Sequence, residues 1–129
     1  MQERPEVPMK ILLVDDDPRI RALVSLTLGK QYTILEAEDG IKGLEMAGVE
    51  LPDMMFLDVE MPGLNGFEVC NRIKGNEATA NIKVVMLTGH SAEDDQDRGR
   101  AVGADDYFTK PFSPRALLEK VTEILETLG

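Results

Sequence analysis

The chain has 129 residues, 43% of them hydrophobic and 29% charged, which is the composition of a single soluble globular domain. Its net charge of −10 argues against direct binding of this domain to the phosphate backbone of a nucleic acid. No apolar run is long enough to span a membrane, and the start of the chain lacks the apolar segment of a signal peptide. Cys70 has no second cysteine with which to form a disulfide. We therefore expect a cytoplasmic protein without membrane contact.

The first predicted elements alternate between strand and helix. Residues 11–14 form an apolar run typical of a buried strand. The apolar residues between Pro18 and Gly29 then keep helical spacing, with Pro18 suited to the first turn and Gly29 to the end. A short strand is predicted at residues 33–36, and a helix, weakened by two glycines, at residues 41–48.

The middle of the chain repeats this alternation. A third strand is predicted to open at Pro52-Asp53 and to end at Asp58. A helix follows at residues 67–75, in which Cys70 is best interpreted as a small buried residue. A fourth strand is predicted at residues 82–87.

The last predicted elements differ in their apolar content. Residues 91–100 have almost no apolar side chains, and we interpret them as a helix capped by Ser91. A fifth strand is predicted at residues 106–109. The last helix begins after Ser113 as its cap and carries a strong apolar stripe as far as Leu128.

Five apolar strands alternating with five helices predict an α/β fold, in which an open parallel sheet is covered by helices on both faces. We expect residues 9–129 to form this one domain and residues 1–8 to be a flexible tail. The chain has no predicted segment left over for an output domain.

Polar side chains follow four of the predicted strands at their carboxyl ends, where ligands bind in parallel α/β sheets. Carboxylates crowded at one edge repel one another and hold protons unless a cation joins them. These four strand ends bring Asp15, Asp16 and Asp17, then Asp58, Thr88 and Lys110, to one edge, and the pattern therefore predicts a divalent metal site with phosphoryl chemistry there. We interpret Asp17 as a helix cap rather than as part of the metal site.

Four motifs in this order and spacing resemble those of the receiver domain of two-component response regulators. They are residues 13–18 (LVDDDP), 57–66 (LDVEMPGLNG), 86–89 (MLTG) and 103–112 (GADDYFTKPF), and the resemblance covers Lys10 to Leu128. It implies a flavodoxin-like, CheY-like (βα)5 fold with strand order 2-1-3-4-5.

The resemblance also implies a role for each residue at the sheet edge. Asp58 would accept a phosphoryl group from the phosphohistidine of a sensor kinase or phosphotransfer protein. Mg²⁺, with Mn²⁺ as an alternative, would be held by Asp16 and Asp58, by Asp15 through water, and by the main-chain carbonyl of Glu60. Oxygen ligands of this kind are what Mg²⁺ prefers.

Further roles follow from the same resemblance. Thr88 and Lys110 would contact the phosphoryl oxygens, and Tyr107 would change its rotamer on activation. The side chains of Glu60 and His90 would border the site and tune the lifetime of the phosphoryl group. The domain would be a phosphoacceptor with slow autodephosphorylation rather than a turnover enzyme.

The expected reporting surface is the fourth helix, the fifth strand and the last helix. It would act on a downstream protein or on a fused output domain outside this chain. A homodimer through this surface is a hypothesis, in which Asp105 or Asp106 pairs with Arg115 or Lys120 across a two-fold axis.

Other functional classes remain open from the residues. An Asp-nucleophile phosphatase would require a second Asp two positions after the first, where this chain has Glu60. A flavin-binding protein of this fold would require hydroxyls and glycines, not three aspartates, after the first strand. A phosphorylation-independent interaction module of the same fold is the third alternative.

Overall fold

The protein forms one parallel sheet, seen in a computed structural model that describes residues 9–89, 97–98 and 100–126. The strand order is β2-β1-β3-β4-β5, and each neighbouring pair is parallel. The strands are β1 (Lys10–Val14), β2 (Thr33–Ala37), β3 (Met54–Asp58), β4 (Lys83–Thr88) and β5 (Asp106–Thr109). The predicted fold class and strand order are confirmed, and the predicted strand boundaries differ from the observed ones by two residues at most.

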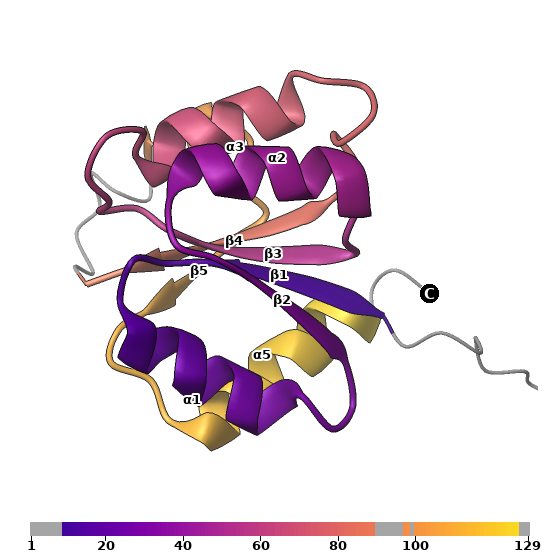
Figure 1. Ribbon diagram of the computed structural model, residues 1–129, viewed down its shortest axis with the longest axis vertical. Coiled ribbons are helices and arrows are strands. Elements are labelled where there is room, and N and C mark those ends of the chain that lie inside the picture. Colours follow the sequence, from indigo (N-terminus) through magenta and orange to yellow (C-terminus); the bar gives the residue numbers. More distant parts are fainter. Residues whose placement is uncertain (1–8, 90–96, 99, 127–129) are drawn as a thin grey trace, which may run out of the picture.

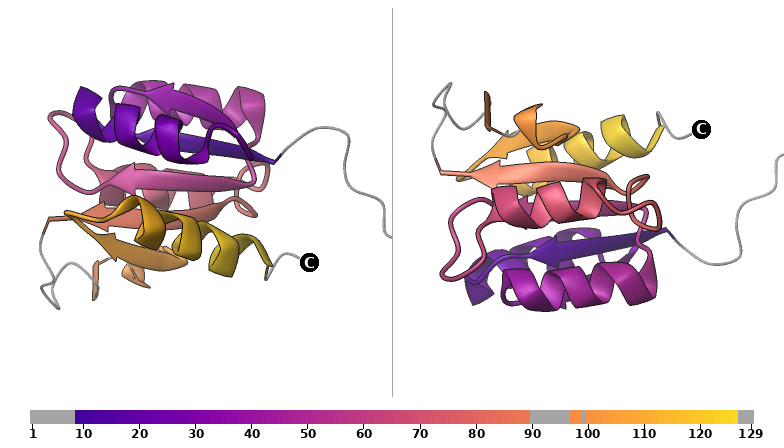
Figure 2. Two further views of the ribbon diagram at one scale, coloured as in Figure 1. Left: turned by 90° about the horizontal axis from the view of Figure 1, so that it is seen from below. Right: turned by 90° about the horizontal axis from the view of Figure 1, so that it is seen from above.

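Helices cover both faces of the sheet (Figure 1). On one face lie α1 (Pro18–Leu28) and α5 (Pro114–Glu126), and on the other α2 (Gly40–Glu50) and α3 (Gly66–Lys74). The two views in Figure 2 show each helix pair lying along the strands. None of the described helices has both the length and the apolar character that crossing a membrane requires.

Side chains that alternate along each strand build two separate cores, one on each face. Ile11 and Leu13 of β1 pack with Val24 and Leu28 of α1, whereas Leu12 of β1 packs on the opposite face. The central strands are buried on both faces, which explains why their sequences are continuous apolar runs. Cys70 of α3 is fully buried in the core on the α2–α3 side, as predicted.

Side-chain caps fix where the helices begin. Asp17 accepts a hydrogen bond from the main chain of Arg19 and caps α1, as predicted. Asn65 and Glu68 form a capping box at the start of α3. Ser113 accepts a hydrogen bond from the main chain of Ala116 at the start of α5, which confirms the predicted cap.

Most of the predicted helix at residues 91–100, including Ser91, lies outside the described residues, as does Leu128. The described residues 97–98 and 100–101 are helical. The Arg98 guanidinium lies over the ring of Phe67, 4.1 Å from its centroid, and connects this turn to α3.

All strands point toward the same edge of the sheet, which both views in Figure 2 show by their arrowheads. The connections that follow β1, β3, β4 and β5 therefore begin side by side at that edge. The predicted metal and phosphoryl residues lie in these connections or at the strand ends: Asp15, Asp16, Asp58, Glu60, Thr88 and Lys110.

Candidate functional site

Asp58 is the last residue of β3 and is only 4% exposed. The chain around it is held by a hydrogen bond from the main-chain N–H of Val59 to the carbonyl of Leu87 on β4. The main-chain N–H of Glu60 donates to Asp58 Oδ1 at 3.2 Å. Burial, and next the neighbouring charge of Asp15, raise the pKa of Asp58 to about 6.

Asp15 and Asp16 follow β1 directly. Asp15 is fully buried, and its Oδ1 accepts a hydrogen bond from the main-chain N–H of Asp17 at 2.9 Å. Its Oδ2 is also buried and accepts no well-directed hydrogen bond, although the Lys110 ammonium lies 2.8 Å away. Asp16 is exposed, and one carboxylate oxygen from each of Asp15, Asp16 and Asp58 lies within 4.8 Å of the others.

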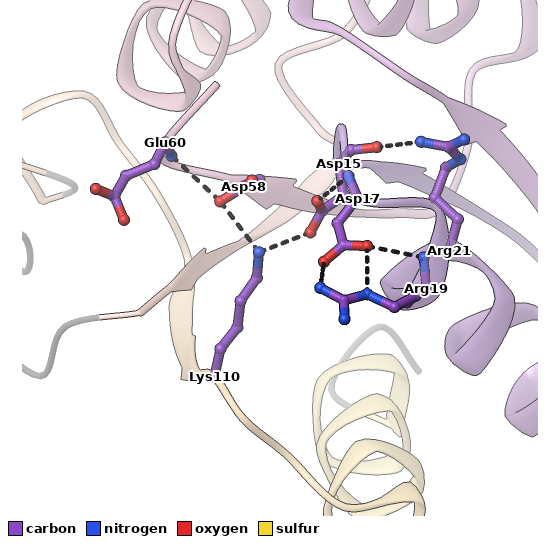
Figure 3. A network of polar contacts seen from close by, with 7 residues as sticks. All are labelled: Asp15, Asp17, Arg19, Arg21, Asp58, Glu60 and Lys110. Carbon is purple, nitrogen blue, oxygen red and sulfur yellow. Dashed lines mark hydrogen bonds and ion pairs between the residues drawn. The ribbon is translucent and has the colours of Figure 1, made fainter. Parts of the chain in front are cut away.

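Lys110 brings a positive charge into this acidic pocket from the chain after β5 (Figure 3). Its Nζ lies 2.8 Å from Asp15 Oδ2 and 3.4 Å from Asp58 Oδ1. Burial lowers the pKa of Lys110, but the close contact with the Asp15 carboxylate and the charge of Asp58 outweigh burial and raise the pKa overall. Lys110 therefore carries its positive charge at neutral pH.

The position of Lys110 is set by the main chain. Its N–H donates to the carbonyl of Thr88 at the end of β4, at 2.7 Å. The peptide bond between Lys110 and Pro111 is cis. The hydrogen bond to Thr88 places the start of the β5–α5 connection beside the end of β4.

The donor set fits a hard divalent cation. Three carboxylates meet here, and the single ammonium of Lys110 offsets only part of their charge. The buried Asp15 Oδ2 has no well-directed hydrogen-bond donor, which is the kind of atom that a cation or its water would satisfy. Carboxylate oxygens without nitrogen or sulfur ligands favour Mg²⁺ or Mn²⁺.

The remaining predicted site residues lie at or near the same edge. Thr88 is the last residue of β4, is 2% exposed, and lies opposite Thr109 of β5. Glu60 is exposed after β3, and its Oε1 would be 3.8 Å from a Cβ placed on Gly89. His90 lies outside the described residues.

Tyr107 lies one position before Phe108 on β5 and is half-buried against the core on the α2–α3 side. It pairs in register with Met86 of β4, two residues before Thr88. Burial raises the pKa of Tyr107, and a hydrogen bond with the main chain of Arg100 opposes this shift in part. Tyr107 thus connects Arg100 to the strand that carries Thr88.

The structure also places a residue beside the pocket that sequence reasoning missed. Arg21 of α1 donates from Nη1 to the main-chain carbonyl of Asp15 at 2.8 Å, and its Nε lies 3.3 Å from Glu36 Oε1 on β2. A signal was present in the sequence, because the positive end of the helix dipole disfavours an arginine in the first turn of a helix. Such a residue needs a partner, and here it has two.

Comparison with known proteins agrees with the fold and the pocket. Residues 11–122 match the family described as the response regulator receiver domain. The chain is 44% identical over 117 residues to the DNA-binding dual master transcriptional regulator RpaA of Synechocystis. The matched region covers 90% of this chain and 48% of that protein. It is 40% identical over 120 residues to the phosphate regulon transcriptional regulatory protein PhoB of Pseudomonas aeruginosa, covering 92% of this chain and 52% of that protein.

The chain thus spans about half the length of the curated relatives that it matches. Among solved structures it resembles the chemotaxis protein CheY4 of Vibrio cholerae, with a TM-score of 0.88 and 33% identity over 92% of this chain and 99% of that one. The sequence match, the shared fold and the acidic pocket agree with one another. The chain therefore belongs to the response regulator receiver domain family of two-component systems.

Proposed function

We propose that this receiver domain is a phosphoacceptor that takes a phosphoryl group on Asp58 from the phosphohistidine of a sensor kinase or phosphotransfer protein. An oxygen of the Asp58 carboxylate attacks phosphorus, the phosphorus–nitrogen bond breaks, and the imidazole leaves with that electron pair and takes up a proton. The product is an acyl phosphate on Asp58. The observation that carries the proposal is the convergence of Asp15, Asp16, Asp58 and Lys110 in one pocket.

The side chains in the pocket suit this reaction. When bound, Mg²⁺ (or Mn²⁺) would be held by Asp16 and Asp58, by Asp15 through water and by the Glu60 carbonyl, and would offset the repulsion between the pocket and the incoming phosphoryl group. Lys110 provides a compact cation 3.4 Å from Asp58 Oδ1, where it can bind a phosphoryl oxygen. The Thr88 hydroxyl at the neighbouring strand end is a short donor that can turn toward the same group.

The signal is a shift between two conformations. An acyl phosphate adds about two negative charges to Asp58 and attracts Thr88 and Lys110. Tyr107 follows toward Thr88, and the surface formed by the fourth helix, β5 and α5 changes. Phosphorylation shifts the populations of the two conformations only because it interacts more favourably with one of them than with the other. The difference in interaction free energy is typically a few kcal/mol. Glu60 follows β3, His90 follows Gly89 in the sequence, and both side chains are proposed to tune how long the acyl phosphate survives.

We propose that a partner of this receiver carries the output. Residues 9–129 form the receiver unit, and a downstream protein or a fused output domain reads its state in the cytoplasm. RpaA and PhoB are named as transcriptional regulators, which supports a regulatory output of that kind for this chain. A homodimer through the fourth helix, β5 and α5 belongs to the same proposal.

Labelling with acetyl phosphate in the presence of Mg²⁺ tests the phosphoacceptor role. We expect about one phosphoryl group per wild-type chain, none on Asp58→Asn, and none after EDTA removes the cation. Asp53→Asn is a matched control, because Asp53 precedes the opposite end of β3, where it accepts a hydrogen bond from the main chain of Lys10. Equal labelling of Asp58→Asn and wild type would refute the proposal, and repeated turnover of a phosphate monoester would favour the phosphatase alternative.

A further inference from the structure

The Asp16 carboxylate depends on its own main chain for its position. It is exposed and forms no hydrogen bond or ion pair with any residue that the structure describes. Asp15, in contrast, is buried and held by Lys110 and by the main chain of Asp17. The peptide unit that joins Asp15 to Asp16 therefore decides where the Asp16 carboxylate lies.

That peptide unit is fixed on its carbonyl side by Arg21. The Asp15 carbonyl accepts a hydrogen bond from Arg21 Nη1 at 2.8 Å (Figure 3). On the other side of the same residue, the Asp15 N–H donates to the carbonyl of Ala37 on β2 at 3.1 Å. Both main-chain groups of Asp15 are thus held, one by α1 and one by β2.

Arg21 is itself held in place by β2. Its Nε lies 3.3 Å from Glu36 Oε1, and the second oxygen of Glu36 accepts a hydrogen bond from the Ser25 hydroxyl at 2.6 Å. Glu36 directly precedes Ala37, so the contacts form a closed ring through β2, α1 and the end of β1. The Arg21 side chain is only 19% exposed, which restricts the conformations open to it.

We propose that Arg21 is a positioning residue of the cation pocket: through the Asp15 carbonyl it orients the peptide that carries Asp16, and Glu36 and Ser25 orient Arg21. This inference rests on the proposed function, because it takes the pocket formed by Asp15, Asp16 and Asp58 as the cation site. Groups that orient metal ligands from the next layer commonly change metal affinity by about 10–100-fold when removed.

The sign of the effect separates positioning from simple electrostatics. A guanidinium beside an acidic pocket repels a cation, so the loss of its charge alone would tighten cation binding. Loss of positioning would weaken cation binding, because the peptide that carries Asp16 would no longer be fixed in one orientation. The two accounts of Arg21 therefore predict opposite changes.

The test is isothermal titration of the full chain with Mg²⁺ and with Mn²⁺ alone. We expect Arg21→Ala to weaken binding about 10-fold. Arg21→Lys should fall between this variant and wild type, because a single ammonium keeps the charge but cannot bond the Asp15 carbonyl and Glu36 as a planar fork. Ser25→Ala, which changes no charge, should weaken binding about 2–3-fold, a smaller effect than direct loss of Arg21.

Arg72→Ala is the matched control, since Arg72 is exposed near the end of α3, at the opposite end of that helix from Asp58. Its cation affinity should equal that of wild type. Urea unfolding of each variant shows whether the protein is folded under the titration conditions. In a fully folded variant, a loss of stability alone leaves the dissociation constant for the cation unchanged.

Unchanged or tighter binding by folded Arg21→Ala would overturn the inference. If Arg21→Ala does not fold, the decision passes to Ser25→Ala and Arg21→Lys, and wild-type affinity in both would overturn it. A wild-type chain that binds neither cation would remove the pocket of the proposed function itself. Wild-type binding that is insensitive to Arg21 would remove only the positioning role.

Discussion

Asp58 is a buried carboxylate whose charge costs stability when no cation is bound. Burial, followed by the charge of Asp15, raises its pKa from 3.8 to about 6. Below pH 3.8 this group is protonated in both the folded and the unfolded chain. Between pH 3.8 and 6 the folded chain holds the proton more tightly, so ionisation destabilises the folded state progressively, and above pH 6 the cost is complete.

Asp58→Asn removes this cost and is therefore expected to stabilise the cation-free protein by about 1–3 kcal/mol at pH 8, since each pKa unit corresponds to about 1.4 kcal/mol. The gain should shrink as the pH is lowered toward 4. Urea unfolding in EDTA at pH 8, 6 and 5 measures it. Asp53→Asn serves again as the control, and a gain that is the same at every pH would contradict the argument.

The residues of the pocket were predictable to different degrees. Asp15, Asp16, Asp58, Thr88 and Lys110 were predicted at one edge, because parallel strands bring their carboxyl ends together whatever the details of packing. The structure places all of them at or beside that edge. The ring through Arg21 and Glu36 depends on how α1 crosses β2, which the spacing of apolar residues does not determine.

At the scale of elements, the connection from β3 to α3 determines how closely the helix approaches the Asp58 strand end. Gly66 begins α3, and a Cβ there would lie 2.3 Å from the Asp58 carbonyl oxygen and 2.8 Å from Val59 Cα. Both neighbours are main-chain atoms, which cannot turn away as a flexible side chain can. The helix can start here only because residue 66 is glycine.

We therefore expect Gly66→Ala to lower the free energy of unfolding by about 1–3 kcal/mol, as overpacking typically does. Urea unfolding of the two proteins at one pH measures the difference. Full stability in Gly66→Ala would show that the start of α3 shifts without strain.

Gly48→Ala is the matched control for this substitution. Gly48 lies in the exposed part of α2, and a Cβ there would meet no atom within 4 Å. Alanine is the better helix former, so this variant should gain about 0.5–1 kcal/mol. Replacing glycine by alanine is thus expected to lower the free energy of unfolding at Gly66 and to raise it at Gly48. The sequence predicted that Gly48 weakens its helix, but it did not predict the effect at Gly66.

At the scale of the whole molecule, the fold class followed from the alternation of strands and helices. The order of the strands did not, because the apolar runs of β1, β3 and β4 look alike and each is buried on both faces. The order came from the resemblance in the motifs, and the pairing of β1 with both β2 and β3 confirms it. The segment at residues 91–100 offered too few apolar side chains to fix its boundaries by pattern.

The charges proposed to join two chains already have partners within one chain. Lys120 Nζ lies 2.8 Å from Asp106 Oδ2 and 3.2 Å from Glu123 Oε1, and Asp105 Oδ2 lies 2.9 Å from Lys74 Nζ. Exchanging one half-exposed ion pair for another gains little free energy. Each chain also carries a net charge of −10, so two chains repel each other at long range.

We therefore expect the unmodified chain to sediment as a monomer and a dimer to form only when beryllofluoride and Mg²⁺ occupy the pocket as a phosphoryl analogue. Sedimentation velocity over a range of protein concentrations measures both states, and Asp58→Asn, which lacks the carboxylate that beryllofluoride binds, should remain a monomer throughout. A dimer without beryllofluoride would mean that the pairs of Lys120 and Asp105 do exchange between chains at no cost. A monomer under both conditions at high concentration would remove the dimer from the proposed function and leave signalling to contacts with a different protein.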